Sequence, residues 1–179
     1  MDIDHSNWFI SGKAFLSPSE NIYQEIELDI SADQLWPYII EGEKRALWQT
    51  GVTSALPLTL DGFGLGSRLI VVYNVGESLW DVEEIIVQFE PKVSIKTLVK
   101  AENYEGHVMV NLTSLPKGRI KLSYDIEKIR LTYKAKLWGP IKNYAENAEL
   151  KIALISLMEL IKLITYQSKG FQKPLNNEP

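Results

Sequence analysis

Residues 145–167 read AENAELKIALISLMELIKLITYQ and carry the pattern of one long helix. At 1.5 Å per residue, such a helix is roughly 35 Å long. A surface helix usually buries an apolar face only a little wider than ~100°. Here almost everything in the second half is apolar except a narrow polar stripe: Ser156, Glu159, Lys162 and Thr165. We therefore expect this helix to lie across a sheet and to have more apolar surface than one flat contact covers.

The chain before this helix begins with a strand and two short helices. Residues 22–30 alternate strictly, which predicts a half-buried strand whose inner face carries the even-numbered residues. Ser31 is a candidate N-cap for a helix that begins at Ala32. Pro37 removes a backbone donor, so we expect this helix to be short or kinked. A second short helix is expected at residues 42–48.

Six further strands are expected between the second short helix and the long one. Turn-forming Gly, Pro and Asn residues separate the candidates, which lie at 52–58, 67–73, 79–89, 93–100, 107–114 and 118–135. We expect Trp138-Gly139-Pro140 to end the sheet. The whole order predicts one curved antiparallel sheet folded around one long helix.

Two of these strands change phase midway. The apolar alternation shifts after Val82 in one strand and after Ile126 in the other. A bulge in each strand would restore the pattern and curve the sheet. Adjacent strand residues point to opposite faces, so we expect Glu83 and Glu84 to be solvated charges rather than paired catalytic acids.

The composition is that of an ordinary globular domain and excludes several kinds of site. The 179 residues are 45% hydrophobic and 23% charged, which suits a single domain. The absence of cysteine excludes disulfides, thiolate catalysis and cysteine-based zinc or iron–sulfur sites. His5 and His107 are the only histidines and form no paired-histidine motif, so we expect no metal ion and no cofactor.

We expect a cytoplasmic protein that neither inserts stably into a membrane nor binds nucleic acid. The N-terminus has no signal-peptide pattern, and the longest nearly apolar run, residues 152–164, is too short to span a bilayer. A net charge of −4 argues against binding to a phosphate backbone.

Charge is distributed unevenly along the chain. Residues 1–90 contain 4 basic and 15 acidic side chains, whereas residues 91–179 contain 15 basic and 8 acidic ones. The two halves either form lobes with different partners or interleave in one sheet and neutralise each other. We favour the second interpretation.

Several short motifs occur in an order that points to a known family. Residues 26–36, IELDISADQLW, look like an opening strand that leads into a first helix, and Trp48 stands where a tryptophan commonly closes the second. Gly64-Leu65-Gly66-Ser67-Arg68 is similar to the glycine turn that begins the third strand. Residues 87–91 resemble the end of the fourth strand, and residues 112–118 resemble the turn before the last strand. Together these motifs resemble the START-like superfamily, also called birch-pollen-allergen-like or polyketide cyclase/SRPBCC. The frequent threonine after the last glycine is Arg119 here.

The resemblance implies an α+β helix-grip fold. This fold has a curved seven-stranded antiparallel sheet around one long C-terminal helix, with two short helices between strands 1 and 2. Residues 22–168 would form the domain, with residues 1–21 as an N-terminal extension and residues 169–179 as a tail. Proteins of this superfamily bind lipids, sterols, polyketides or quinones between sheet and helix, and some are enzymes.

The resemblance also suggests how to decide between the two interpretations of the uneven charge. In such folds the first strand lies beside the last. We therefore expect cross-strand ion pairs in which Glu25, Glu27 and Asp29 face Arg119 and Lys121. Each pair would contribute well under ~1 kcal/mol, because exposed pairs are screened.

Apolar and aromatic residues near the expected inner face are the candidates for lining the cavity. Each of these side chains either contacts a ligand or only packs in the core, and the Trp and Tyr side chains would present their polar edges to the ligand. No nucleophile–base pair is recognisable, so we name no catalytic residue. The cavity-lining candidates are Trp36, Trp48, Tyr73, Trp80, Tyr124, Trp138, Leu154 and Met158.

Our preferred prediction is a non-catalytic binder or carrier of a small hydrophobic ligand such as a lipid, polyketide or quinone. One alternative is an enzyme of the polyketide cyclase or dehydratase type, which needs an ionisable group inside the cavity. The other alternative is an interaction module in which another chain, such as a second copy in a homodimer, or a membrane face covers the apolar helix surface.

Overall fold

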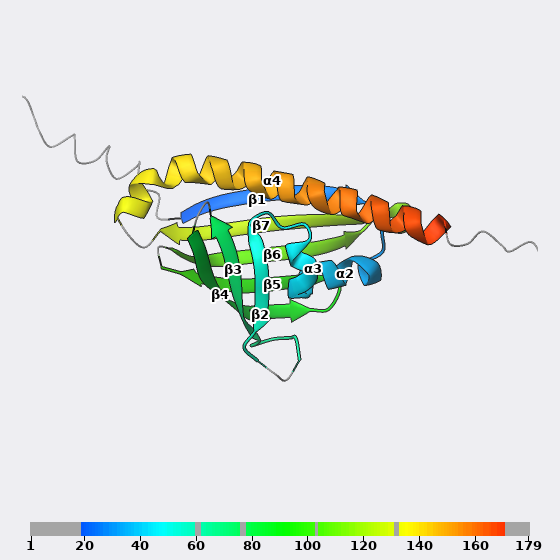
Figure 1. The fold of residues 1–179 in the computed structure, drawn as a ribbon, viewed down its shortest axis with the longest axis horizontal. Helices are drawn as coiled ribbons and strands as arrows, with labels where there is room; N and C mark the ends of the chain where they lie inside the picture. Colours follow the sequence, from blue (N-terminus) through cyan, green and yellow to red (C-terminus); the bar gives the residue numbers. More distant parts are fainter. Residues whose placement is uncertain (1–18, 60–61, 76–77, 103, 131–132, 171–179) are drawn as a thin grey trace, which may run out of the picture.

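The computed structural model describes residues 19–59, 62–75, 78–102, 104–130 and 133–170 (Figure 1). The extension and tail predicted at the two ends fall almost entirely outside these residues. The described elements are β1 (Ser19–Leu28), α2 (Ala32–Ile40), α3 (Gly42–Ala46), β2 (Val52–Pro57), β3 (Arg68–Val75), β4 (Ser78–Glu90), β5 (Ser94–Ala101), β6 (Tyr104–Ser114), the 3-10 turn η2 (Pro116–Gly118), β7 (Ile120–Arg130) and α4 (Tyr133–Gly170).

The strands form one antiparallel sheet in the order β1-β7-β6-β5-β4-β3-β2. Helix α4 runs along β1 and β7, and α2 and α3 lie below it where the sheet curves round (Figure 1). This is the predicted α+β helix-grip architecture, with its two short helices between the first two strands. None of the helices in the described part of the chain is long and apolar enough to cross a membrane.

The first short helix forms as predicted. Ser31 caps it, because its hydroxyl accepts from the backbone N–H of Gln34 while the Gln34 side chain accepts from the backbone N–H of Ser31. Pro37 lies inside this nine-residue helix, which ends at Ile40. The indole N–H of Trp48 then donates to the backbone oxygen of Tyr38 at 2.9 Å, which joins the segment after α3 to α2.

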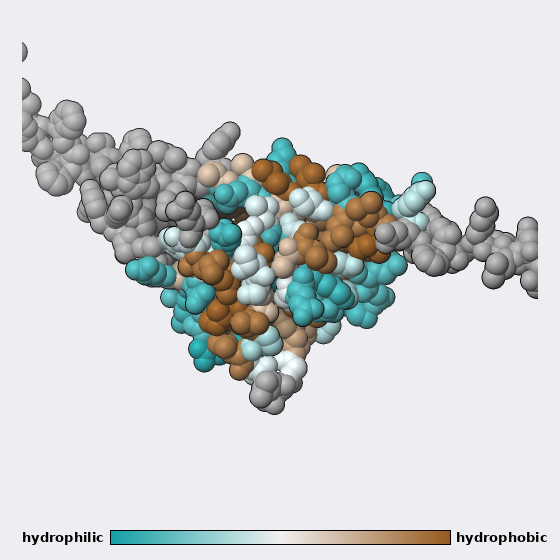
Figure 2. Space-filling model, in the orientation of Figure 1, coloured by the Kyte–Doolittle hydropathy of each residue, from teal (hydrophilic) through white to brown (hydrophobic). Residues whose placement is uncertain are grey.

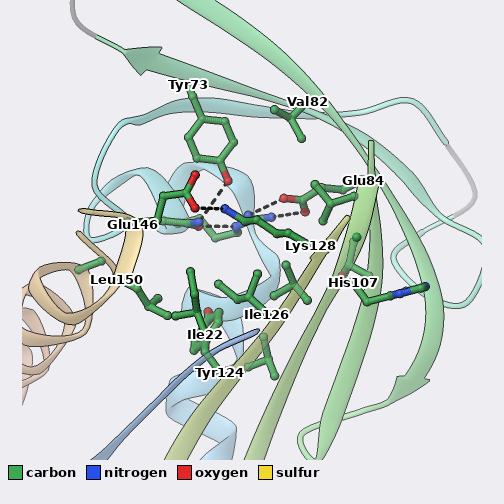
Figure 3. Close-up of a pocket in the computed structure, with 18 of the residues that line it drawn as sticks. Ile22, Tyr73, Val82, Glu84, His107, Tyr124, Ile126, Lys128, Glu146 and Leu150 are labelled. Carbon is green, nitrogen blue, oxygen red and sulfur yellow. Dashed lines mark hydrogen bonds and ion pairs between the residues drawn. The ribbon is translucent and has the colours of Figure 1, made fainter. Parts of the chain in front are cut away.

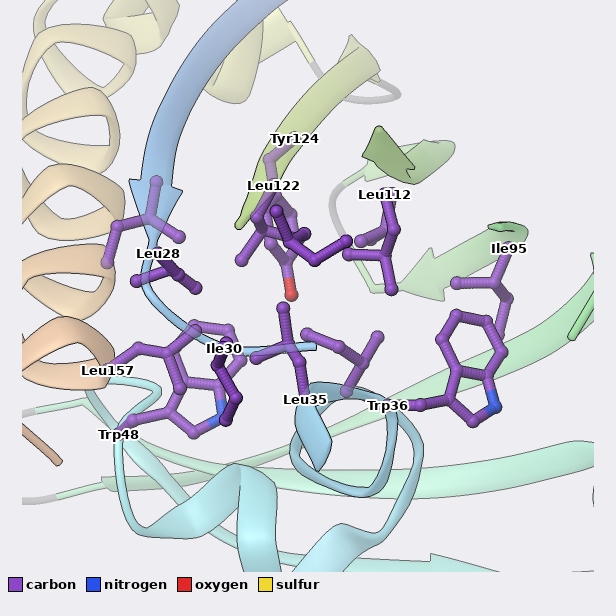
Figure 4. Close-up of a cluster of buried hydrophobic side chains, with 14 of the residues drawn as sticks. Leu28, Ile30, Leu35, Trp36, Trp48, Ile95, Leu112, Leu122, Tyr124 and Leu157 are labelled. Carbon is purple, nitrogen blue, oxygen red and sulfur yellow. The ribbon is translucent and has the colours of Figure 1, made fainter. Parts of the chain in front are cut away.

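One face of α4 packs into the hydrophobic core (Figure 4). Ala153, Leu154, Leu157 and Ile161 are buried, and Leu157 is fully enclosed with Leu28 and Leu122 of the sheet. The opposite face carries large exposed side chains: Ile152, Ile155, Leu163 and Tyr166. Figure 2 shows brown, hydrophobic patches along the part of the surface where α4 runs. The predicted excess of apolar surface on this helix is therefore confirmed.

The pairing of β1 with β7 confirms that the two oppositely charged halves interleave. Glu27 lies opposite Lys121 in the register. Arg119 Nη1 lies 2.8 Å from Glu27 Oε2, and Lys121 Nζ lies 3.6 Å from Glu25 Oε2. These pairs are substantially exposed, so their effect is local neutralisation of charge rather than a large gain in stability. Asp29 follows the end of β1.

Two details of the predicted sheet are corrected. A bulge does interrupt β4, between Ile86 and Gln88, but β7 keeps its register with both neighbours throughout. Strand β7 ends at Arg130 and α4 begins at Tyr133, well before the expected start at residue 145. The Gly139-Pro140 pair that suggested the end of the sheet lies inside the helix, where proline is tolerated at the cost of a hydrogen bond and a bend.

We expect Leu157→Ala to destabilise the protein by about 2–5 kcal/mol, because it opens a cavity where helix and sheet meet. Leu163→Ala, on the same helix but 62% exposed, should change stability by less than ~0.5 kcal/mol. Urea unfolding followed by circular dichroism measures both. Equal effects of the two substitutions would mean that the helix does not present this face to the sheet.

Candidate functional site

A cavity of about 720 Å³ lies between the inner face of the sheet, α3 and the part of α4 around residues 145–153. Most of its wall is apolar and comes from many elements at once (Figure 3). The helix contributes Leu150 and Ala153, and the sheet contributes Ile22, Leu69, Val82, Ile86, Ile95, Val99, Val108, Val110 and Ile126. An apolar body of small-molecule size would find hydrophobic contacts on several sides.

The sheet register brings two charged residues to the inside of this cavity. Glu84 pairs with Val99, Val99 with Gly106, and Gly106 with Lys128, so these four residues form one row across the inner face. The bulge in β4 comes after Glu84, and β7 has no bulge before Lys128. The prediction that Glu84 is a solvated surface charge is therefore wrong.

Glu84 is held by Arg45 of α3 in a two-point ion pair. The two guanidinium nitrogens of Arg45 donate to the two carboxylate oxygens at 2.9 and 3.0 Å, and Nε donates to Gln49 Oε1 at 3.1 Å. The side chains are only 12% and 9% exposed. Burial lowers the pKa of Arg45, but the charge and hydrogen bonds of Glu84 outweigh burial and raise that pKa overall.

This pair also explains how α3 is placed. The helix has five residues, none of them buried, and no side-chain cap. Such a short segment is unstable on its own. The bidentate contact from Arg45 to β4 supplies a fixed tertiary anchor, which also gives the cavity a rigid polar wall.

A second ion pair joins the sheet to α4 at the same end of the cavity (Figure 3). Lys128 Nζ lies 2.8 Å from Glu146 Oε2. Glu149, one turn further along α4, lines the cavity as well. Nearby, the side-chain amide of Gln49 donates to the Tyr73 hydroxyl at 3.3 Å. One end of the cavity is thus charged and hydrogen-bonded, whereas the rest is largely apolar.

Aromatic side chains close a different part of the cavity wall. Phe63 lines the cavity from the glycine-containing loop before β3, and its ring meets Phe89 edge-on at 5.7 Å. Phe89 in turn packs against Trp36, at 5.9 Å between ring centres. The hydroxyl of Ser67 donates to the Gly62 carbonyl and accepts from the Gly64 N–H, which fixes the loop that carries Phe63.

The structure brings together only part of the predicted cavity lining. Tyr73, Trp80 and Tyr124 do line the cavity. Trp36, Trp48 and Leu154 are instead buried in the core, and Met158 packs against it, because α2, the segment after α3 and the middle of α4 pack against the sheet there. The side chain of Trp138 lies outside the described residues.

The described residues contain no group of three His, Asp or Glu side chains that could hold a metal ion. His107 alternates with inward-facing Gly106 and Val108 on β6, and its ring points away from Glu84 and Lys128 (Figure 3).

We expect Glu84→Gln to destabilise the protein by about 3 kcal/mol, because it leaves the buried Arg45 charge without its counterion. The matched control is Glu159→Gln, which removes the carboxylate of the exposed Glu159–Lys162 pair. That change should cost less than ~0.5 kcal/mol. Urea unfolding measures the free energy of unfolding of both variants. Similar losses of stability in the two would contradict a structural role for the Arg45–Glu84 pair.

No protein-family profile and no curated protein matches the sequence. Solved structures do match the fold. A conserved protein from Geobacillus kaustophilus superposes with a TM-score of 0.66 at 13% identity, covering 80% of this chain and 95% of that one.

Two further matches have descriptive names. A START superfamily protein from Mycobacterium smegmatis gives a TM-score of 0.55 at 12% identity, over 75% of this chain and 98% of that one. A norcoclaurine synthase point mutant from Thalictrum, in complex with a transition-state analogue, gives 0.60 at 15% identity, over 82% and 96%. At such identities a structural match shows a shared fold and leaves function to the site. The chain has the START-like helix-grip fold.

Proposed function

We propose that this protein binds a small, mainly apolar ligand in the cavity between the sheet and α4. The observation that carries the proposal is the cavity itself, whose volume of about 720 Å³ lies within the usual range for ligand pockets. Binding would be driven by burial of apolar ligand surface, at about 25 cal/mol per Å². The ion pairs at one end would orient a polar part of the ligand.

Catalysis is the second candidate function, and one observation favours it. An enzyme of the cyclase or dehydratase type needs an ionisable group inside the cavity, and Lys128 and Glu146 supply an amine and a carboxylate there. In the present arrangement each neutralises the other. A ligand would have to separate them before either could transfer a proton. Recovery of a bound compound chemically unchanged after long incubation would count against this candidate.

An interaction module is the third candidate. It rests on the exposed apolar face of α4, which includes Ile152, Ile155 and Leu163. Analytical ultracentrifugation over a range of concentrations measures whether a second copy covers this face.

Native mass spectrometry of freshly purified protein, followed by solvent extraction, is the direct test of the first proposal. We expect a mass above that of the 20.4 kDa chain and an apolar compound in the extract. Protein that carries nothing, and that shows no thermal shift with a panel of lipids and polyketides, would count heavily against ligand binding.

A pair of neighbouring substitutions locates the binding site. Val108 lines the cavity, whereas the next residue of β6, Met109, faces the other side of the sheet. Val108→Phe should fill part of the cavity and weaken binding of 1-anilinonaphthalene-8-sulfonate at least about tenfold, while Met109→Phe leaves it unchanged. Fluorescence titration measures both. Equal effects would place the dye elsewhere on the protein.

A further inference from the structure

Two hydroxyl groups in the cavity wall have no hydrogen-bond partner among the residues that the structure describes. Tyr124 on β7 and Thr97 on β5 both line the cavity, and they are only 7% and 8% exposed. Among the described residues, neither side chain makes a hydrogen bond. The ring of Tyr124 packs against that of Trp48, with 6.1 Å between centres, but a ring contact does not satisfy the hydroxyl.

Such groups are rare in folded proteins. More than about nine in ten buried polar groups are hydrogen-bonded, and a buried hydroxyl without a partner costs stability. Phenylalanine and valine would fill the same two positions without that cost. What occupies the cavity can supply partners for both hydroxyls, either water or the oxygen atoms of a ligand.

Thr97 and Tyr124 start from other rows of the sheet than the charged residues. Lys128 and Glu84 occupy one row of the inner face, Thr97 lies in the next row, and Tyr124 in the row after that. Thr97 and Tyr124 are two strands apart, which separates their backbones by about 10 Å across the sheet. The Tyr124 side chain points from β7 towards Leu35 of α2 and towards Trp48, which follows α3 (Figure 4).

The Tyr124 hydroxyl is a donor at neutral pH. Burial raises its pKa, and although nearby Arg45 opposes that effect, the net shift is upward. A protonated phenol can donate to a carbonyl, ether or hydroxyl oxygen, and the threonine hydroxyl can donate or accept.

We infer that Tyr124 and Thr97 form a hydrogen-bonding subsite that selects ligands with an oxygen atom on an otherwise apolar body. The inference rests on the proposed ligand-binding function and narrows it to oxygen-containing ligands over plain hydrocarbons. Aliphatic chains without a polar atom in their middle would leave both hydroxyls unsatisfied and would bind less well.

The test uses two probes of nearly the same shape, fluorene and 9-fluorenone, which differ by one carbonyl oxygen. Their affinities are measured by displacement of 1-anilinonaphthalene-8-sulfonate from the full chain and from Tyr124→Phe, Thr97→Val and the double variant. Each substitution removes one oxygen and keeps the shape of the side chain. Fluorene affinity then reports whether the cavity of each variant is intact.

We expect the wild-type protein to bind 9-fluorenone about three- to tenfold more tightly than fluorene, the factor that one net hydrogen bond allows. The preference should fall in whichever single variant removes the contacting hydroxyl and disappear in the double variant, with fluorene affinity unchanged throughout. If one single variant fails to fold, the other still measures how far the preference for 9-fluorenone falls.

Two outcomes overturn the inference in different ways. Equal affinities for the two probes in the wild type, or a preference that survives the double substitution, would mean that only water satisfies these hydroxyls. The proposed ligand-binding function would stand in that case. Failure of the dye and of both probes to bind would remove the proposed function together with the subsite.

Discussion

Uninterrupted pairing of β7 with β1 and β6 is the constraint on which the core and the cavity both depend. The register runs from Ile120 to Arg130 without a bulge, so alternate residues of β7 face the same side. Leu122 is thereby fixed in the core, Tyr124 in the cavity wall and Lys128 at the charged end. A slip of one residue would turn all three away from the helix.

The charged end of the cavity is not explained by stability alone. Replacing a buried ion pair by apolar residues of similar size is often neutral or stabilising, because desolvation offsets the attraction between the charges. Arg45 and Glu84 nevertheless occupy a place that Met and Leu could fill. Their contact fixes the orientation of α3, which contributes no side chain to the hydrophobic core, and leaves polar atoms facing the cavity. A pocket with one polar end can hold an amphipathic molecule in one direction, which a uniformly apolar pocket cannot.

Sequence patterns predicted the architecture and much of the pairing, but they missed the polar half of the site. The structure confirms the features that depend on neighbouring residues, which are the alternation at residues 22–30 and the cap at Ser31. It also confirms the pairing of β1 with β7 that their opposite charges suggested. The inward positions of Glu84 and Lys128 were missed because a charged residue at an inward position interrupts the apolar alternation. In the sequence, that interruption looks like a shift of the whole strand pattern by one residue. The signal was present, since Glu84 lies midway between the buried residues Val82 and Ile86. Its partner Arg45 comes from a separate helix, and no spacing along the chain predicts that contact.

Helix α4 passes through two different surroundings. Leu157 and Ile161 are enclosed by the core, whereas Leu150 and Ala153 pack against the core and also line the cavity. Packing contacts stabilise all four side chains, but Leu150 and Ala153 would gain further contacts from a molecule in the cavity. Among the described side chains, the Lys128–Glu146 ion pair and the hydrogen bond from Gln24 to Asn147 also join this part of α4 to the sheet. A ligand between this part of the helix and the sheet would add apolar contacts to these, so occupancy of the cavity would stabilise this part of the helix.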